Sequence, residues 1–137
     1  MPRSAANFVA VMAKQIITTD KVALPLVPLS SAVRTGNLLF VSGTTPFNRE
    51  HKVAKGDFPT QMRQTMENLK AVLEAGGSAF DKVVKVNVIL RRISDFVAMN
   101  EIYRSYFNEG GYPARTTIEA KLPHEDFLLE IECVAEI

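Results

Sequence analysis

The chain has 137 residues, of which 47% are hydrophobic and 23% are charged, and its formal net charge is +1. That length suits one domain with one core, and a charge so close to balance does not favour a nucleic-acid partner. Cys133 is the only cysteine, so an internal disulfide is excluded and a cytoplasmic, reducing location is predicted, while no apolar run approaches the roughly 20 residues of a membrane span.

The N-terminal residues differ in composition from the rest of the chain. Residues 1–13 include Arg3 and no acidic residue, which faintly resembles a transit peptide, although the apolar run 8–12 is too short for a signal peptide. We expect residues 1–13 to form a flexible extension and residues 14–137 to form a single domain. A start codon placed upstream of a natural start at Met12 and a weak targeting segment are the alternatives.

The first part of the domain is predicted to contain a short strand, an extended loop and a hairpin. Residues 15–18 fit a strand, and the prolines of segment 24–30 make that segment extended. Residues 31–34 and 38–42 fit two strands joined by a tight turn about Gly36. The polar segment that follows the hairpin fits a loop.

A long amphipathic helix is predicted to follow this loop. Asp57 is a good N-cap residue, Pro59 is tolerated in a first turn, and Gly76 and Gly77 fit a helix end. The apolar residues with helical spacing between these limits are Met62, Met66, Leu69, Val72 and Leu73. The β-branched segment 83–90 then fits a strand.

A second helix and two strands complete the domain. Ser94 or Asp95 is expected to cap the helix, and Gly110 is expected to stop it. Residues 115–121 and 128–137 fit strands. The element order β-β-β-α-β-α-β-β predicts an α+β fold, with a mixed sheet that carries two helices on one face.

The face of the sheet away from the helices is predicted to be too apolar for water. Both faces of segment 38–41 are apolar, and in segment 83–90 we expect Val84 and Val86 to share one face while Ile89 lies on the other. Two helices cover only one face of a sheet. A homo-oligomer that buries the second face is therefore predicted, with polar residues lining clefts between subunits.

Arg115 and Glu130 are the leading candidates for chemistry. Strand alternation places Arg115 on the face of Thr117 and Glu130 on the face of Glu132, and we expect both candidates to lie free of the helix-covered core. An arginine fork suits bidentate capture of a carboxylate, and a glutamate beside it suits a general base. A structural ion pair for Arg115 and a solvated strand face for the glutamates are the alternatives, and periodicity does not separate Glu130 from Glu132.

Five further residues carry weaker signals. His51 and His124 lie in predicted loops without a second ligand at metal spacing, so no metal site is expected. Cys133 alternates onto the core face and fits a small buried hydrophobe rather than a nucleophile. Gly43 follows Ser42 at the end of a strand, where a plain turn and a close backbone approach to a ligand fit equally well.

Several segments together resemble the RidA (YjgF/YER057c/UK114) family. They are residues 38–46, residues 64–77, Asn100-Glu101-Ile102-Tyr103, Tyr112-Pro113-Ala114-Arg115 and Leu129-Glu130-Ile131-Glu132, and they follow one another in order along the predicted domain. The resemblance implies a chorismate-mutase-like fold and a homotrimer with three clefts between subunits. It also implies cofactor-independent hydrolysis of 2-imino and 2-enamino acids of the 2-aminoacrylate type to 2-oxo acids and ammonia.

Position by position, the resemblance implies roles for particular residues. Arg115 would bind the substrate carboxylate, and Glu130 would activate the attacking water. The positions that would line the pocket are Ser42, Gly43, Asn100, Thr117 and Leu29.

The chain departs from the family pattern in this pocket. Leu29 stands where typical members have a tyrosine, and Thr44 stands where many have a glutamine. A more apolar pocket follows, which suits a larger or more hydrophobic imino or enamine acid. A 2-aminomuconate-type deaminase in aromatic degradation, a non-catalytic module that binds small carboxylates, and a ribonuclease are the alternatives.

Overall fold

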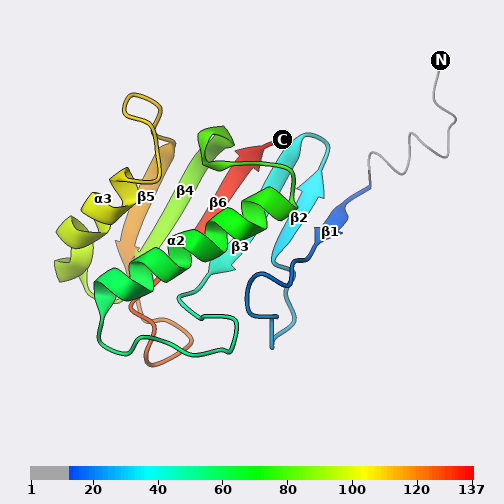
Figure 1. Ribbon diagram of the computed structural model, residues 1–137. Coiled ribbons are helices and arrows are strands. Elements are labelled where there is room, and N and C mark those ends of the chain that lie inside the picture. The colour runs from blue at the N-terminus through cyan, green and yellow to red at the C-terminus, as the bar shows by residue number, and fades with distance from the viewer. Residues whose placement is uncertain (1–12) are drawn as a thin grey trace, which may run out of the picture.

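The computed structural model describes residues 13–137, which form a six-stranded sheet flanked on one face by two helices (Figure 1). The strand order is β1-β2-β3-β6-β4-β5, in which β4 and β5 are parallel and the other neighbours are antiparallel. The strands are β1 Gln15–Ile17, β2 Ala32–Thr35, β3 Leu38–Thr44, β4 Val83–Leu90, β5 Ala114–Glu119 and β6 Leu129–Glu136. The predicted α+β fold and its element order are confirmed, whereas the predicted extension lies almost wholly outside the described residues.

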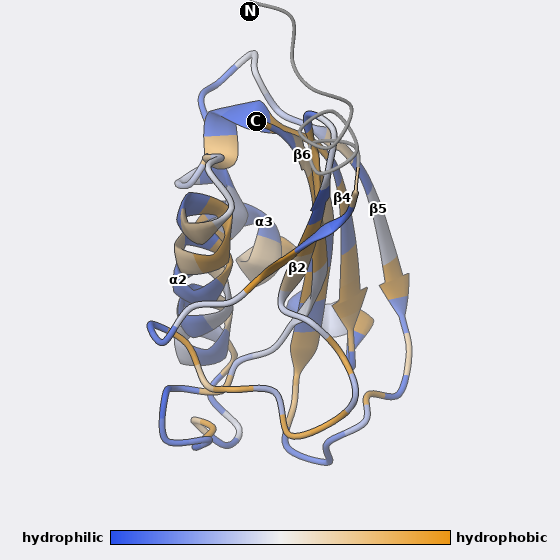
Figure 2. Ribbon diagram, turned by 90° about the vertical axis from the view of Figure 1, so that its right-hand side faces the viewer, coloured by the Kyte–Doolittle hydropathy of each residue, from blue (hydrophilic) through white to orange (hydrophobic). Residues whose placement is uncertain are grey.

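Both helices cover the same face of the sheet (Figure 2). α2 spans Phe58–Ala75 and α3 spans Phe96–Arg104. α2 begins as predicted, because the Asp57 carboxylate accepts a hydrogen bond from the backbone N–H of Thr60 at 3.1 Å. Gly77 follows the end of α2 at φ +82°, a left-handed conformation that glycine adopts without strain. No helix in the described part of the chain is long and apolar enough to cross a membrane.

The core fills the space between the helices and the sheet. Leu69 and Leu73 of α2 are buried against it, as their helical spacing predicted, and Leu129, Ile131 and Cys133 of β6 are buried on the facing side of the sheet. The largest fully buried apolar side chains are Leu39, Met62, Met66, Leu69, Leu73, Val86, Val88, Leu90, Met99, Leu129 and Ile131.

A β-bulge changes the predicted alternation at the start of β4. The pairing of β4 with β6 shifts register between Val83 and Lys85. Val83 is buried and Val84 is 42% exposed, so the prediction that Val84 shares the buried face of Val86 is wrong. The extra residue of a bulge reverses the order in which side chains alternate.

α3 is shorter than predicted. It ends at Arg104 rather than near Gly110. Tyr106 and Phe107 lie in the turns that follow it, where both rings pack against Phe80 at centroid distances of 5.4 and 5.3 Å. The two residues also fit helical spacing in the sequence, but their apolar rings pack in this aromatic cluster beyond the end of the helix.

No helix of the described residues covers the second face of the sheet (Figure 2). Phe40 and Ile118 lie on this face and are 44% and 51% exposed. Polar groups lie between them, such as Asn87, whose Nδ2 donates to Glu132 at 2.8 Å. The predicted mixture of apolar and polar side chains on this face is present.

Candidate active site

Glu130 lies near the start of β6, on the face of the sheet that carries no helix. It pairs with Ile89 of β4, while its neighbours Leu129 and Ile131 are buried in the core, as alternation predicted. Burial raises the pKa of the half-buried Glu130 carboxyl, and the negative charge of Glu132 raises it further. A carboxylate with a raised pKa is a stronger base than an ordinary glutamate, which suits proton abstraction from water.

A glycine lets the Glu130 carboxylate lie against the backbone of β3. The pairing of β3 with β6 shifts register between Val41 and Thr44, and this irregularity brings Gly43 beside Glu130. A β-carbon at Gly43 would stand 2.6 Å from Oε1 of Glu130, closer than real contacts allow. Gly43 lies within β3 rather than in a plain turn, and the group that approaches its backbone is the Glu130 carboxylate; a close approach to a ligand stays a prediction.

An apolar cavity of about 290 Å³ opens beside Glu130 at the end of β3. Leu29, Ser42 and Gly43, which the sequence singled out, line this cavity together with Glu130. The remaining lining residues are Val22, Ala23, Leu24, Pro25, Leu26, Val27, Ser31, Thr44, Thr45, Phe47, His51, Asn68, Val72, Pro123, His124 and Phe127. We use the name Glu130 site for four of the lining residues, which are Leu29, Ser42, Gly43 and Glu130.

The sequence analysis placed His51 and His124 in loops and did not connect them with Glu130. The ring of Phe47 contacts His51 and His124 edge-on at centroid distances of 5.4 and 5.5 Å, and His124 stacks on Phe127 at 4.7 Å. These four rings form one wall of the cavity. Their positions in the sequence could have indicated that these rings lie near Glu130. Phe47 follows the Ser42-Gly43 segment, and His124 precedes Glu130 by few residues.

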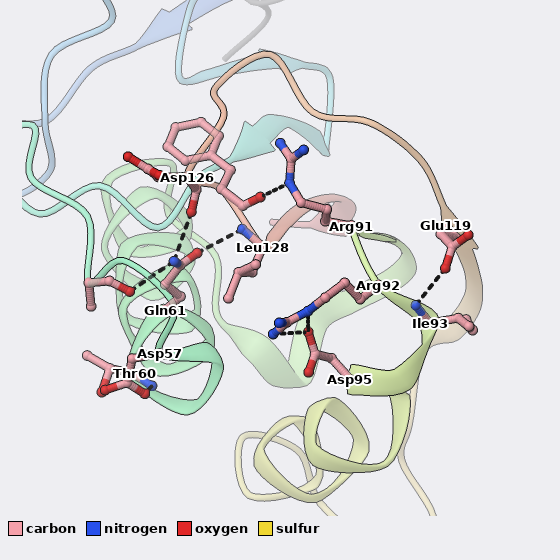
Figure 3. Close-up of polar contacts among 12 residues, drawn as sticks. Asp57, Thr60, Gln61, Arg91, Arg92, Ile93, Asp95, Glu119, Asp126 and Leu128 are labelled. Atoms are coloured by element: carbon pink, nitrogen blue, oxygen red, sulfur yellow. Dashed lines mark hydrogen bonds and ion pairs between the residues drawn. The ribbon is translucent and has the colours of Figure 1, made fainter.

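Two polar side chains, the buried Gln61 and the half-buried Arg91, hold the segment that leads into β6 (Figure 3). Gln61 of α2 donates from Nε2 to the carbonyl of Asp126 at 2.9 Å and accepts at Oε1 from the backbone N–H of Leu128 at 2.9 Å. Arg91 donates from Nε to the carbonyl of Phe127 at 2.6 Å and from Nη2 to that of His124 at 2.7 Å. These four hydrogen bonds fix the backbone of the segment and thereby help to position both the aromatic wall and Glu130.

Arg115 lies on the other face of the sheet, against α3. It pairs with Val86, which is buried under the helices. Its guanidinium carbon lies 4.9 Å from the ring centroid of Tyr103 and 5.7 Å from that of Phe96, and Nη1 lies 3.7 Å from Sδ of Met99. The prediction that Arg115 is free of the helix-covered side is therefore wrong. Alternation divides the side chains of β5 between two faces but does not say which face meets the helices. The parallel pairing of β5 with β4 and the contacts with the aromatic rings of α3 place Arg115 on the helix-covered face.

Two unpaired hydroxyl groups accompany Arg115. The hydroxyl of Tyr103 and Oγ1 of Thr117 are buried and have no hydrogen-bond partner within residues 13–137. Burial raises the pKa of Tyr103 to about 12, so this hydroxyl is neutral. Asn100 is half-buried on α3, next to Met99. We call Arg115, Tyr103 and Thr117 the Arg115 site; the guanidinium together with the unpaired hydroxyl of Thr117 suits a ligand with several oxygen atoms.

One protomer does not bring the two sites together. Val86 pairs with Arg115, while Ile89, three residues further along β4, pairs with Glu130. Directly paired residues point to the same side of a sheet, and residues three apart on a strand point to opposite sides. Arg115 and Glu130 therefore lie on opposite faces, with β4 between their strands. β5 is an edge strand, so Arg115 lies at the border of the molecule.

Cys133 and the histidines do not form a reactive or metal-binding group. Burial raises the pKa of the Cys133 thiol to about 12, which keeps it protonated, as expected of a small buried hydrophobe. Within residues 13–137 no cluster of three histidine, cysteine or acidic side chains is placed to bind a metal.

The chain is similar to known proteins over most of its length. Residues 20–137 match the family model described as endoribonuclease L-PSP. The chain is 42% identical over 125 residues to a RutC family protein of Pyrococcus abyssi, an alignment that covers 90% of this chain and 98% of that one. It is 36% identical over 126 residues to a 2-iminobutanoate/2-iminopropanoate deaminase of Dermatophagoides farinae, with 90% and 97% covered. A crystal structure of YyfA, a protein of unknown function from the conserved Rid family in Yersinia pestis, is 34% identical and superposes with a TM-score of 0.86 over 91% of this chain and all of that one.

Proposed function

The chain belongs to the RidA family, also known as YjgF/YER057c/UK114 and RutC, which includes imine deaminases, and from that premise we propose that it hydrolyses 2-imino and 2-enamino acids to 2-oxo acids and ammonia. The observation that carries the proposal is a pair of complementary groups. Arg115 forms no ion pair with an acidic side chain of the described residues, and Glu130 has a raised pKa beside an open cavity. The first group suits a carboxylate and the second suits an attacking water.

The proposed reaction consumes one water and releases one ammonia without a redox change. Arg115 binds the 2-carboxylate through its fork and thereby orients the C=N bond. Glu130 takes a proton from water while the water oxygen bonds to the imine carbon. Glu130 passes this proton to the imine nitrogen, which gives a neutral carbinolamine. In the collapse Glu130 takes the hydroxyl proton of the carbinolamine and transfers it to the departing nitrogen, while the C–N bond breaks and the C=O bond forms. An enamine enters the same sequence after a proton shift to its carbon has produced the imine.

We also propose that the complete site combines Arg115 of one protomer with Glu130 of another. The two residues lie on opposite faces of one sheet, and Arg115 belongs to its edge strand. Exposed Phe40 and Ile118 make the helix-free face suitable for burial against another copy. A closed ring of three copies would repeat this contact three times and give three sites, as the family resemblance implies.

The experiment generates imines with D-amino-acid oxidase and traps the remaining imine with semicarbazide. We expect the wild-type protein to remove the imine before it is trapped, and Arg115→Ala and Glu130→Gln each to lose about 100-fold or more of that rate. Arg63→Ala, which removes an exposed arginine of α2, serves as the control for loss of positive charge. The proposal fails if the wild-type protein does not accelerate imine loss, or if Arg115→Ala accelerates it equally.

The other functions considered for this chain make different predictions. A binding module without turnover would be stabilised by 2-oxo acids through Arg115 and would leave imines untouched. A 2-aminomuconate-type substrate carries a second carboxylate, and the side chains of residues 13–137 that line the cavity include neither lysine nor arginine to receive it. A ribonuclease would bind RNA with a strong dependence on salt, for which a net charge of +1 gives no basis.

A further inference from the structure

We propose that the cavity beside Glu130 binds the substrate side chain, and that the preferred substrates are 2-imino acids with a branched aliphatic or aromatic side chain. This inference rests on the proposed deaminase function. It concerns which imine is processed, and it is decided by the chemistry of the cavity rather than by Arg115 or Glu130.

The size of the cavity exceeds what a small imine requires. Its volume is about 290 Å³, and it extends from Glu130 past Leu29 to the rings of Phe47 and Phe127. A benzene molecule is accommodated in an apolar cavity of about 150 Å³. The methyl group of the imine derived from alanine would leave most of this volume unfilled, whereas a phenyl or isobutyl group would occupy it.

Several polar groups of the cavity wall are already paired within the protein. Nε2 of His51 lies 2.8 Å from the carbonyl oxygen of Leu24, and Nδ2 of Asn68 donates to the carbonyl of Phe47 at 2.7 Å. Oγ of Ser42 donates to a backbone carbonyl at 2.5 Å. A polar side chain on the substrate would lose its hydration and find these three groups already engaged, so the wall favours apolar side chains.

Contacts within the protein also hold the wall in place. Phe47 and Phe127 contact edge-on at 4.8 Å, and His124 stacks on Phe127. The hydrogen bonds of Arg91 to the carbonyls of Phe127 and His124 hold two of these rings in place. A preformed apolar wall binds an apolar group without an ordering cost, which favours large apolar side chains over small ones.

Leu29 and Thr44 are the two lining residues at which the resemblance to the RidA family leads one to expect more polar side chains. Leu29→Tyr combined with Thr44→Gln introduces one phenol and one amide into the lining without changing Arg115 or Glu130. We expect this double variant to lose its preference for large apolar side chains, because the added groups occupy volume and require polar partners.

The test compares imines that one oxidase generates from D-alanine, D-leucine and D-phenylalanine, with semicarbazide as the trap. We expect the wild-type kcat/KM to be at least about tenfold higher for the leucine and phenylalanine imines than for the alanine imine, since each added methylene in an apolar pocket contributes roughly a tenfold preference. The Leu29→Tyr/Thr44→Gln variant should reduce that ratio toward one, and Arg63→Gln on the surface of α2 should leave it unchanged.

The outcomes separate the substrate class from the reaction. Equal rates for the three imines, or a preference for alanine, overturn the substrate class and leave the deaminase function standing. If the wild-type protein hydrolyses none of the three imines, the deaminase function is overturned. As a measurement independent of turnover, 4-methyl-2-oxopentanoate and phenylpyruvate should raise Tm more than pyruvate does at equal concentration, and an equal or smaller rise contradicts the inference.

Discussion

The carboxylate of Glu130 lies against the α-carbon of Gly43, in a space that a β-carbon would fill. The ideal β-carbon position at Gly43 is 2.6 Å from Oε1 and 2.7 Å from Cδ of Glu130. Gly43 thus determines where the proposed base stands relative to the backbone of β3 and to the cavity. Its role depends on the absence of a side chain rather than on backbone flexibility.

Gly43→Ala is expected to displace the Glu130 carboxylate and to lower kcat/KM for imine hydrolysis by about 100-fold, the typical effect of a misplacement near 1 Å. The clash involves the far end of a flexible side chain, so Tm should change little. Gly111→Ala is the matched control, because a β-carbon there meets the Asn108 carbonyl oxygen at an ordinary 3.5 Å. Full activity in Gly43→Ala at unchanged Tm would contradict the assigned position of the base.

The pH dependence of hydrolysis should report the charge of Glu132. Its negative charge raises the pKa of Glu130, so Glu132→Gln should lower that pKa and keep Glu130 ionised at more acidic pH. If ionised Glu130 is the base, kcat/KM rises with pH through this pKa, and the variant's acidic limb moves to lower pH. Glutamine can still accept the hydrogen bond from Asn87. Glu136→Gln, further along β6, serves as the control, and an identical limb in Glu132→Gln and wild type would exclude Glu130 as the titrating base.

Tyr103 is expected to position Arg115 through its ring rather than through its hydroxyl. Tyr103→Leu removes the ring that lies 4.9 Å from the guanidinium carbon and should raise KM about tenfold with a smaller change in kcat. Tyr103→Phe keeps the ring and removes a buried hydroxyl without a partner in the described chain, so it should keep KM and gain up to about 1 kcal/mol in the free energy of unfolding. Equal rises of KM in both variants would instead assign the hydroxyl to the substrate.

Complementation between two inactive variants should reveal whether a site uses two protomers. Arg115→Ala and Glu130→Gln are expected to be inactive alone. When they are co-expressed with different tags and the mixed oligomers are purified, activity should return, because one interface in each mixed trimer combines an intact Arg115 with an intact Glu130. With one intact site of three, the purified mixed trimers should show about a third of the wild-type rate. Mixed oligomers without activity would place both residues of each site in the same protomer.

Much of the fold was predictable because its determinants are local. Asp57 caps α2 through its own side chain, and Gly77 follows its end in a left-handed conformation. Alternation along β6 correctly placed Glu130 opposite the core. These features depend on residues that are close along the chain, and their physical rules operate before any tertiary contact forms.

The errors arose where pairing between distant strands decides the outcome. Strand alternation places Arg115 and its neighbour on opposite faces, but it does not say which face meets the helices. That choice is made by the pairing of Arg115 with Val86 and by the contact with the ring of Tyr103. The bulge that exposes Val84 belongs to the pairing of β4 with β6 and leaves no mark within β4 itself.

The sequence by itself determined the order of the elements and the core face of β6, and through the family resemblance it led to the proposal of Arg115 and Glu130 as a pair. The tertiary structure decided that these two residues lie on opposite faces of the sheet, and that His51 and His124 form part of a wall beside Glu130. Local rules follow from the geometry of consecutive residues. The meeting of loops and strands that are far apart in the chain depends on the register of the sheet and on side-chain packing, which no local pattern encodes.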